Sequence, residues 1–540
     1  MGQIAPALFG MVIMPKSDNI YPVVIIGGGL AGLTAATYLA NADIPPLVLD
    51  ADAHWTGGRL ASGDADIITY KGQEWCFTPE HGIHAVWGGY VNLRRLIAEF
   101  TPTQLNTSDG EEWVNRWRRD IRKIEAGNAV RSRWIPAPFH YLQLLLRPRF
   151  WTGITPLDFL SLPGFLFSIG WAIGFDPLKE QSALDGLPMR EFFRGWTPNL
   201  RATFTGLGAN LLAAPPDNIS VASFIAALRF YTVLRRDSWK MEFFPTNAGD
   251  CLITPLVNFI EAQGGKVWRG ATATRLERIN NTWRITLDDY PSGGITRTIY
   301  AEHVIIATNA PSAKQLLLDS PTTAPIAQNI RFPSALRNIV MRLWFDSAPS
   351  GGANSGMFTG DCVLDNFFWL HRLDSEFAEW KKIGGSALEV HLYGEDTILN
   401  QDDRHLLILA VDEVQRAFPE LRGHFVHGAV RRNSKNQTEF RIPTHDSLWV
   451  DTQWENLFMA GDWIGYDTPS LWMERATVTG IASANRVLEA YQTATIPILS
   501  PPPPELLATI LGLLVHLIRL IIKPILWAVR SIRHKQIKKL

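Results

Sequence analysis

The first clear pattern along the chain is an apolar run that stops at a group of glycines. Val23–Ile26 is uniformly apolar, as expected of a strand buried on both faces of a parallel sheet. The glycine-rich stretch 27–32 follows, and apolar residues then recur with helical spacing as far as Leu39. A second apolar run, Leu47–Leu49, ends at Asp50. The pattern predicts a strand, a helix and a second parallel strand, which is the start of an α/β fold.

The glycines have the spacing of a dinucleotide-binding turn. The first glycine allows a tight turn, the second lets the backbone approach a pyrophosphate, and the third lets helix and strand pack closely. Free N–H groups at the helix start favour the phosphate, and an acidic residue 23 positions after the first glycine accepts a bond from a ribose hydroxyl. The predicted cofactor-binding residues here are Gly27, Gly29, Leu30, Ala31, Gly32 and Asp50.

A long apolar stretch in the middle of the chain has two interpretations. Phe159–Phe175 contains no charged residue but is interrupted by Pro163-Gly164. The pattern suits either a core helix or a shallow hairpin that dips into a membrane.

The C-terminal segment combines an apolar face with a basic one. After Pro501–Pro504, residues 505–540 carry seven basic side chains and one acidic one. His516 and three basic residues recur at steps of 3, 4 and 7, which places them on a single helical face: His516, Arg519, Lys523 and Arg530. We expect an amphipathic helix lying in a membrane interface with anionic lipids; a helix docked on the protein body and a single tilted span are the alternatives.

Composition excludes several classes of protein. Hydrophobic residues make up 46% of the chain and charged residues only 19%, which is unlike a disordered protein. A net charge of −1 gives no support for nucleic-acid binding. The cysteines, Cys76, Cys251 and Cys362, lie far apart, and His81 and His84 have no acidic or cysteine partner nearby, so we expect neither a disulfide framework nor a metal site.

A second glycine motif identifies the cofactor class. Asp50 is followed, after six residues, by Gly57-Gly58-Arg59, which resembles the flavin amine oxidase and phytoene desaturase superfamily. In that superfamily this segment wraps the FAD pyrophosphate. Two glycines let N–H groups close on phosphate, and an arginine pairs with its charge. The resemblance implies that Gly57, Gly58 and Arg59 bind FAD.

The C-terminal part of the chain also resembles this superfamily. Gly461-Asp462 matches a pair whose acid binds the ribityl and phosphate region, and residues 473–480 match the helix start beside the isoalloxazine. The resemblance implies that Met473, Arg475 and Ala476 lie at the flavin. Arg475 replaces a frequent glycine, and our hypothesis is that it stabilises negative charge on a reduced flavin.

These motifs imply a discontinuous domain. Val304–Asn309 resembles the strand that returns to the FAD domain, so the expected fold is α/β (α+β): a discontinuous Rossmann-type FAD-binding domain with an inserted substrate domain and a C-terminal amphipathic helix. The expected boundaries are a leader at 1–21, FAD-binding parts at 22–100, 236–310 and 446–495, substrate parts at 101–235 and 311–445, a Pro-rich linker at 496–504 and a membrane-associated tail at 505–540.

One segment resembles a particular branch of the superfamily. Gly82-Ile83-His84, Gly88, Tyr90 and Asn92-Leu93 match the G-x-H-x-x-x-G-x-Y-x-N-L of plant-type phytoene and ζ-carotene desaturases. The same segment resembles β-carotene ring desaturase/methyltransferases. The resemblance implies that Gly82, Ile83 and His84 lie at the flavin and that His84 shapes the substrate end of the cavity.

The middle of the chain resembles the substrate domain of the same branch. Residues 134–231 include its Pro-Ala-Pro opening and its closing motif from Ser220 to Phe230. Farther on, Ile339–Phe345 and Ala387–His391 are expected to form a sheet that floors the substrate cavity.

The resemblance implies an FAD-dependent oxidoreductase acting on a lipophilic carotenoid or isoprenoid. The expected reaction is desaturation, or isomerisation, by hydride transfer to flavin N5 in an apolar tunnel, with a quinone as a possible electron acceptor. The candidate catalytic residues are His84, Arg229 and Glu474, with Glu80 as a further candidate base. Alternatives are an amine or protoporphyrinogen-type oxidase, a squalene-pathway dehydroxylase and a non-enzymatic carotenoid-binding flavoprotein.

The N-terminal segment lacks the pattern of a cleavable signal peptide. Residues 4–14 are apolar, but no Lys or Arg precedes Lys16. We read the first 20 residues as a leader, with Met11 or Met14 as an alternative start. The amphipathic tail predicts a membrane-associated protein, peripheral or monotopic at the cytoplasmic face.

Overall fold

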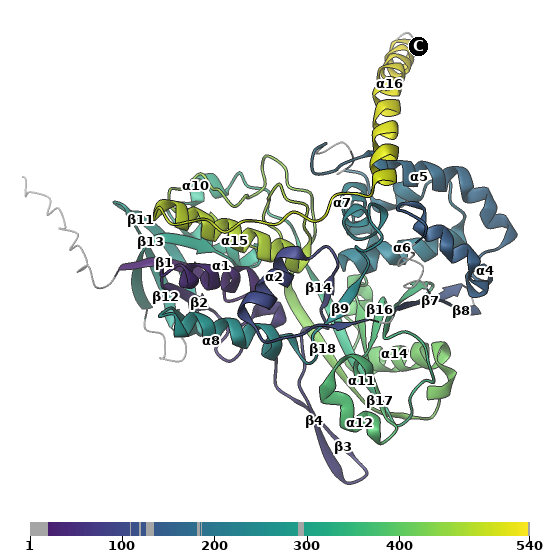
Figure 1. Ribbon diagram of the computed structural model, residues 1–540, viewed down its shortest axis with the longest axis horizontal. Coiled ribbons are helices and arrows are strands. Elements are labelled where there is room, and N and C mark those ends of the chain that lie inside the picture. Colours follow the sequence, from purple (N-terminus) through teal and green to yellow (C-terminus); the bar gives the residue numbers. More distant parts are fainter. Residues whose placement is uncertain are drawn as a thin grey trace, which may run out of the picture.

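A parallel β-sheet with an antiparallel extension carries the nucleotide motifs (Figure 1). The computed structural model describes residues 20–108, 110–117, 120–125, 134–180, 184, 186–289 and 296–537, with side chains up to Ile522 apart from those at 125, 289 and 296. Within these ranges the sheet has the order β10-β2-β1-β13-β12-β11, and β19 pairs with β13. Its strands are β1 (Ile20–Ile26), β2 (Pro46–Asp50), β10 (Lys266–Arg269), β11 (Ala271–Ile279), β12 (Thr282–Asp289), β13 (Thr296–Ile306) and β19 (Leu457–Met459).

The strands of this sheet come from distant parts of the chain. β1 is parallel to both β2 and β13, and β13 is parallel to β19. The discontinuous α/β fold expected from the sequence is therefore confirmed, and the expected strands at 23–26, 47–49 and 304–306 lie next to one another. The expected leader at 1–21 falls largely outside the described residues.

Helices cover both faces of the sheet because successive strand residues point to opposite sides. Val23 and Ile25 pack in one core cluster with residues of α1 (Leu30–Asn41), α8 (Thr254–Ala262) and α15 (Trp472–Ala490). Val24 and Ile26 pack in another with α9 (Ala310–Asp319). Both faces are thus buried, which explains the continuous apolar run in β1.

A second sheet lies beside the first and buries several charged side chains, among them Arg342 and Glu389. Over the described ranges its order is β18-β14-β17-β16-β15-β7-β8. The strands are β7 (Glu111–Trp117), β8 (Asp120–Glu125), β14 (Ala335–Phe345), β15 (Ser355–Gly360), β16 (Asn366–Trp369), β17 (Ser386–Leu392) and β18 (Phe425–Thr438). α14 (Asp403–Ala417) packs against it. The strands expected at 339–345 and 387–391 are present as parts of β14 and β17.

A helical region joins the two sheets on the side of the molecule from which the C-terminal helix extends (Figure 1). It comprises η3 (Phe139–Leu146), α4 (Pro148–Thr152), η4 (Pro156–Ser161), α5 (Leu162–Gly174), η5 (Met189–Phe193), α6 (Pro198–Leu212), α7 (Val221–Leu228) and the π-helical turn η7 (Arg229–Val233).

Of the two structures considered for 159–175, the hairpin is not formed, since η4 runs directly into α5. Pro163 lies in the first turn of α5, where its missing N–H breaks no helical bond, so the Pro-Gly pair begins the helix instead of interrupting it. α5 is not a core helix either, since Leu162, Leu166 and Phe167 are each more than half exposed. Among the described residues, the stretch Pro156–Gly174 is long enough and apolar enough to cross a membrane, and a third of it is buried. A single stretch of this kind is weak support for a membrane span.

The tail forms one continuous helix, α16 (Leu506–Ile537), that starts on the protein body and extends away from it (Figure 1). Its first turns pack on α5, where a Cβ on Gly174 would lie 2.2 Å from Val515. Arg519, one of the residues expected on a free basic face, instead donates to the Gly174 carbonyl and pairs with Glu180 at 2.6 Å. The start of the helix is therefore docked, while Leu513, Leu517 and Ile521 remain exposed.

Candidate functional site

The turn after β1 has the close approaches that its glycines predict. Gly27 has φ +116°, and its added Cβ would lie 2.6 Å from the Ala307 carbonyl. A Cβ on Gly32 would lie 2.0 Å from the Gly27 oxygen, so helix and strand could not pack this closely with any other residue. A Cβ on Gly29 would meet only the Gly57 oxygen at 4.0 Å. The backbone at Gly29 is therefore open for a phosphate.

Asp50 ends β2 with one oxygen bonded and the other bare. Its Oδ1 accepts the Asp52 N–H at 3.1 Å, whereas Oδ2 is buried with no hydrogen-bond partner. Burial raises the pKa of Asp50 to about 6. A buried acceptor without a partner is costly, so this oxygen suits a ribose hydroxyl of a bound dinucleotide.

Arg59 and Asp462 join two motifs that are far apart in the sequence. Gly57 and Gly58 have φ of +126° and +59°, which lets the chain turn back so that Gly57 forms a parallel bridge with Gly29. The turn places the Arg59 guanidinium in an ion pair with Asp462. Both side chains face the same cavity, as the sequence predicts.

The cavity of about 490 Å³ extends from the glycine turn toward the second sheet. In addition to the groups above, it is lined by the segment 81–85, by the start of α15 and by side chains of the second sheet. The sequence-predicted residues that line it are Gly27, Gly29, Leu30, Ala31, Asp50, Gly57, Gly58, Arg59, Gly82, Ile83, His84, Gly461, Asp462, Met473 and Ala476. Gly32 lies beneath them.

His84 faces this cavity as an uncharged imidazole. Burial lowers the pKa of His84 to about 3, and its Nδ1 is buried without a partner. Gly82 has φ +156°, and its added Cβ would lie 3.0 Å from the His391 ring. The segment therefore lies directly on the floor of the cavity.

The floor contains a buried ion-pair network. Glu389 is fully buried; its Oε2 accepts from Arg342 Nε at 2.8 Å, and its Oε1 accepts the Ile83 N–H at 2.6 Å. His391 Nε2 lies 2.8 Å from the same Oε1, and Nδ1 lies 2.8 Å from the Tyr393 hydroxyl. Burial alone would raise the pKa of Glu389, but the Arg342 guanidinium and the His391 ring together keep it well below its ordinary value. The network holds the segment carrying His84 in position.

Of this network, His391 and Tyr393 line the cavity, together with Asn338, Val340, Asn366 and Phe368. The sequence interpretation did not single these residues out. The available signal was charged and polar residues placed inside strands that otherwise read as buried.

Three comparisons with known proteins agree with this geometry. The model of the "Flavin containing amine oxidoreductase" family matches residues 30–488. The chain belongs to this family. It is accordingly an FAD-dependent oxidoreductase, as the glycine motifs and the Arg59–Asp462 pair predict.

Two curated proteins similar to this chain are named for carotenoid reactions. The chain is 24% identical over 417 residues to a 15-cis-phytoene desaturase of Capsicum annuum, a match covering 75% of this chain and 66% of the relative. It is 24% identical over 499 residues to a carotenoid phi-ring synthase of Streptomyces griseus, covering 87% of this chain and 88% of that protein. The chain thus spans about two thirds of the plant relative's length.

Solved structures share the fold. Cyclohexylamine oxidase from Brevibacterium oxydans superimposes with a TM-score of 0.61 at 16% identity, covering 88% of this chain and 100% of that one. The flavin amine oxidase fold expected from the sequence is confirmed.

The observed site fits FAD on its own residues. Asp50 Oδ2 is the bare acceptor for the ribose, the Gly29 backbone is open for the phosphates, and Arg59 and Met473 face the cavity farther along. A Cβ at Gly28 would lie 2.3 Å from Asp50 Oδ2, so any other residue there would push the Asp50 carboxylate out of this position.

Glu474 does not reach the cavity. It is fully buried; its Oε1 accepts from the Asn92 backbone and side chain at 2.9 and 2.7 Å, and its Oε2 accepts the Leu93 N–H at 3.0 Å. These donors are the free N–H groups at the start of α2 (Val91–Phe100). Glu474 therefore caps a neighbouring helix, and its expected catalytic role is wrong on this geometry.

Arg229 and Arg475 are also directed away from the flavin cavity. Arg229 Nη1 donates to the carbonyls of Ala172 and Ile173 at the end of α5. Arg475 donates to Ser470 and to the Ile464 carbonyl. Neither residue lines the flavin cavity, so neither the expected catalysis by Arg229 nor the expected contact between Arg475 and the flavin is supported.

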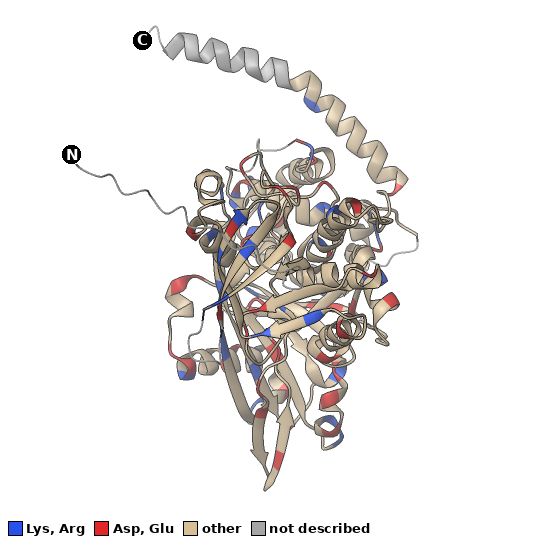
Figure 2. Cartoon of the chain, turned by 90° about the vertical axis from the view of Figure 1, so that its left-hand side faces the viewer, with Lys and Arg blue, Asp and Glu red and all other residues tan. Residues whose placement is uncertain are grey.

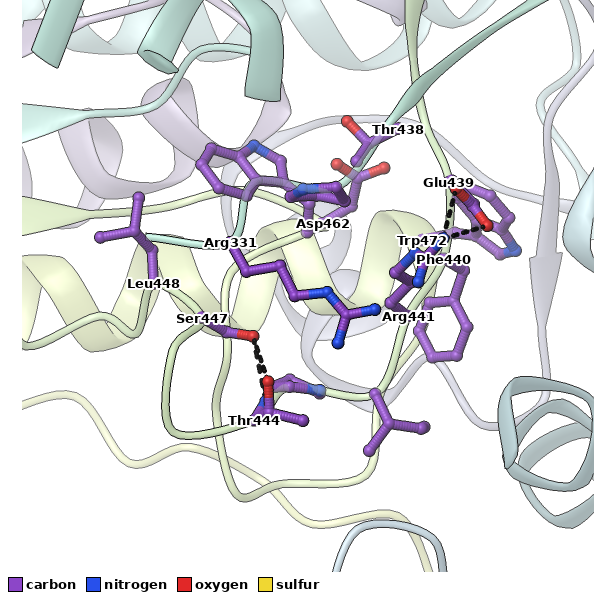
Figure 3. A pocket seen from close by; sticks show the side chains of 14 residues that line it. Arg331, Thr438, Glu439, Phe440, Arg441, Thr444, Ser447, Leu448, Asp462 and Trp472 are labelled. Atoms are coloured by element: carbon purple, nitrogen blue, oxygen red, sulfur yellow. Dashed lines mark hydrogen bonds and ion pairs between the residues drawn. The ribbon is translucent and has the colours of Figure 1, made fainter. Parts of the chain in front are cut away.

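Asp462 also lines a second, small hollow (Figure 3). Arg331, Arg441 and Trp472 border it, and Arg441 pairs with Glu439 at 3.1 Å. Its volume of about 30 Å³ has room for about two water molecules, so it can take neither cofactor nor substrate. Over the described residues, no group of three or more His, Cys, Asp and Glu side chains is arranged to hold a metal ion.

Proposed function

We propose that this enzyme desaturates a long polyene of the carotenoid type, with FAD as the hydride acceptor. The observation that carries the proposal is a cavity that continues from the dinucleotide turn into a wall of aromatic side chains. Two relatives, a phytoene desaturase and a phi-ring synthase, are named for reactions of carotenoids. A polyene offers its enzyme mainly apolar surface, and this wall provides the matching contacts.

The aromatic wall is rigid. Trp87 and Tyr231 have ring centroids 4.6 Å apart, and the hydroxyls of Tyr90 and Tyr231 are hydrogen-bonded at 2.8 Å. Trp472 donates its indole N–H to the Leu211 carbonyl and has φ +51°, a left-handed conformation unusual for a tryptophan. Paired hydroxyls and a bonded indole leave apolar ring faces toward the cavity. Such a wall can align a polyene against a flat cofactor.

The residues of the floor control charge in the cavity. Bound FAD supplies the acceptor for a hydride. His84 is uncharged because of its lowered pKa, so it adds no positive charge that would oppose a cationic polyene. His391 is held by Glu389 and Tyr393, which fixes its ring against the segment at Gly82. These side chains shape the substrate end and exclude water.

The protein is proposed to work at a membrane surface, where such substrates and a quinone acceptor are dissolved. Exposed apolar side chains gather on η3, η4, α5 and α16, including Leu146, Leu160 and Phe167. The described part of α16 is almost free of charged side chains (Figure 2). Contiguous apolar surface of this kind is typical of membrane or protein contacts.

The experiment is anaerobic mixing of the purified, FAD-loaded protein with carotenes dispersed in detergent. We expect the absorbance of oxidised flavin to bleach and a product two hydrogens lighter per event to appear in chromatography with mass detection. An isomerase would change the retention time without changing the mass. Polyamines serve as the control substrate, and bleaching by amines but by no polyene would refute the proposal.

A further inference from the structure

A second cavity, of about 600 Å³, lies behind the flavin cavity. It is lined by residues 176–179 just after α5, by η7, by the loop before α15 and by Pro501–Pro504. The two cavities share their walls: Tyr231 and Trp472 line the flavin cavity, while their neighbours Phe230 and Leu471 line the second one. We call the second one the arginine cavity because Arg229, Arg235 and Arg475 line it.

Arg475 is a buried cation with no carboxylate partner. It is 1% exposed, and no ion pair within 4.0 Å joins it to any described acidic side chain. Its Nε donates to Ser470 and its Nη1 to the Ile464 carbonyl, which leaves Nη2 without a partner in the described part of the chain. Burial lowers its pKa to about 10, so it stays protonated. A buried charge of this kind is stable only when an anion or several dipoles compensate it.

Arg235 presents a second unused donor. It is 6% exposed, its Nη1 donates to the Pro502 carbonyl at 2.7 Å, and its Nε pairs with Asp237 at 3.0 Å. Its Nη2 is buried with no hydrogen-bond partner. The Asp237 side chain is 65% exposed, so solvent screens its charge.

The cavity as a whole carries excess positive charge. Arg229, Arg235, Arg475 and Lys179 line it, against Asp176 and Asp467. Asp176 lies 3.6 Å from Arg229 Nη2 and 4.0 Å from Lys179 Nζ, so it is already shared between two cations. Arg235 and Arg475 therefore remain the donors available to a ligand.

We propose that the arginine cavity binds a phosphate group, with Arg235 and Arg475 donating hydrogen bonds to its oxygens. Guanidinium groups match phosphate oxygens in geometry and charge. A compact dianion or monoanion would satisfy both unused donors and compensate the buried charge on Arg475.

The phosphate source that we favour is the headgroup of an anionic phospholipid. The cavity adjoins the end of α5 and the start of α16, and Arg519 ties these two elements together through Gly174 and Glu180. Leu166 and Leu513, which flank that junction on the two helices, are about 60% exposed. A headgroup bound at the base of this apolar surface would leave its acyl chains alongside the helices. This choice of source rests on the membrane association proposed above; the phosphate site itself does not.

The test compares the full-length, FAD-loaded protein with Arg235→Gln, Arg475→Gln and the control Arg404→Gln. Arg404 is exposed on α14, far from the cavity. Its variant removes one positive charge, as the other two do, without touching the proposed site. Bound FAD per chain reports correct folding of each variant. One arm measures binding to phosphatidylcholine vesicles with and without phosphatidylglycerol. The other measures the melting temperature in inorganic phosphate against chloride at equal ionic strength.

We expect the wild type and Arg404→Gln to prefer the anionic vesicles, and Arg235→Gln to lose that preference by about tenfold or more, the effect of one charge-assisted hydrogen bond. Stabilisation by inorganic phosphate that Arg235→Gln lacks, without any effect on vesicles, would support the site with a soluble phosphate as its ligand. Identical behaviour of Arg235→Gln and Arg404→Gln in both arms, with FAD bound, would overturn the proposal. Neither arm measures turnover, so failure of the desaturase proposal leaves this result unaffected.

Discussion

At the scale of single residues, burial sets the chemistry of the carboxylates. Asp50, Glu80, Glu389 and Glu474 are all buried, yet they have different roles because their partners differ. Asp50 keeps a bare oxygen, Glu389 is compensated by Arg342, and Glu474 caps a helix. The partner, more than the residue type, decides which of them meets a ligand.

Asp50 should make FAD binding depend on pH. Its pKa is raised to about 6, and the ionised form is the better acceptor for a ribose hydroxyl. FAD should therefore bind about tenfold more weakly at pH 5 than at pH 8. Asp50→Asn should bind more weakly at pH 8 and lose the dependence. Flavin fluorescence titration measures both, and Asp64→Asn, an exposed change nearby, should behave as wild type. An unchanged profile in Asp50→Asn would contradict this role.

Ionisation of the buried Glu80 carboxyl should lower the free energy of unfolding as the pH rises. Burial raises its pKa from 4.5 to about 8, so between these values the folded protein binds more protons than the unfolded chain. The free energy of unfolding then falls across that window as the pH increases. Glu80→Gln cannot ionise, and its decline should be shallower.

Urea midpoints at a series of pH values from about 5 to about 8 measure this slope. Glu395→Gln, on an exposed side chain, is the control. A slope as steep in Glu80→Gln as in the control would show that Glu80 does not titrate in this way.

At the scale of elements, α2 depends on a residue from a distant helix. The N-cap residue of α2, Tyr90, makes no side-chain cap, and Glu474 of α15 accepts its free N–H groups instead. The Glu-Arg-Ala run at the start of α15 therefore fastens two helices together.

Glu474→Ala should destabilise the protein by about 2 kcal/mol or more, because it leaves buried donors unpaired. Glu474→Gln retains an acceptor and should lose less. Urea unfolding measures the difference, while turnover per bound FAD should stay near wild type in both variants. Full stability combined with lost turnover in Glu474→Ala would restore a catalytic role.

The glycine turn and Glu474 together show which parts of the site the sequence alone can predict. The glycine turn, Asp50 and the Gly57–Arg59 segment were predictable because backbone geometry within a few residues determines their function. Glu474, Arg229 and Arg475 were misplaced because one turn of helix moves a side chain from one cavity wall to another. His391 was expected only as the end of a strand flooring the cavity, and Tyr393 was missed, because their side chains reach the cavity only when the second sheet packs against the segment at His84.

At the scale of the whole molecule, the helical region and α16 form one apolar end. Leu513, Leu517 and Ile521 lie at successive turns of α16 and are 60%, 54% and 66% exposed. This surface is the basis of the proposed membrane association, and it can be changed without disturbing Glu505, which binds Arg236 at the base of the helix.

Replacing these three residues by serine should reduce partition into phospholipid vesicles by at least about 100-fold, since each loses roughly 1.5 kcal/mol or more of apolar burial. Sedimentation with vesicles measures it. A control with Ile67, Ile383 and Ile408 replaced by serine removes equally exposed side chains elsewhere and should still sediment. Equal sedimentation of both variants would argue against α16 as the anchor.

The order of strands in the nucleotide sheet has a consequence for synthesis on the ribosome. β1 emerges early, yet its neighbour β13 comes from residues 296–306, and Asp462, which completes the pair with Arg59, emerges later still. A nascent chain thus displays an apolar strand with an unpaired edge for most of translation, a known route to aggregation. The FAD site can be completed only after Asp462 has emerged, and because FAD binds the native state alone, its supply should govern the yield of folded enzyme.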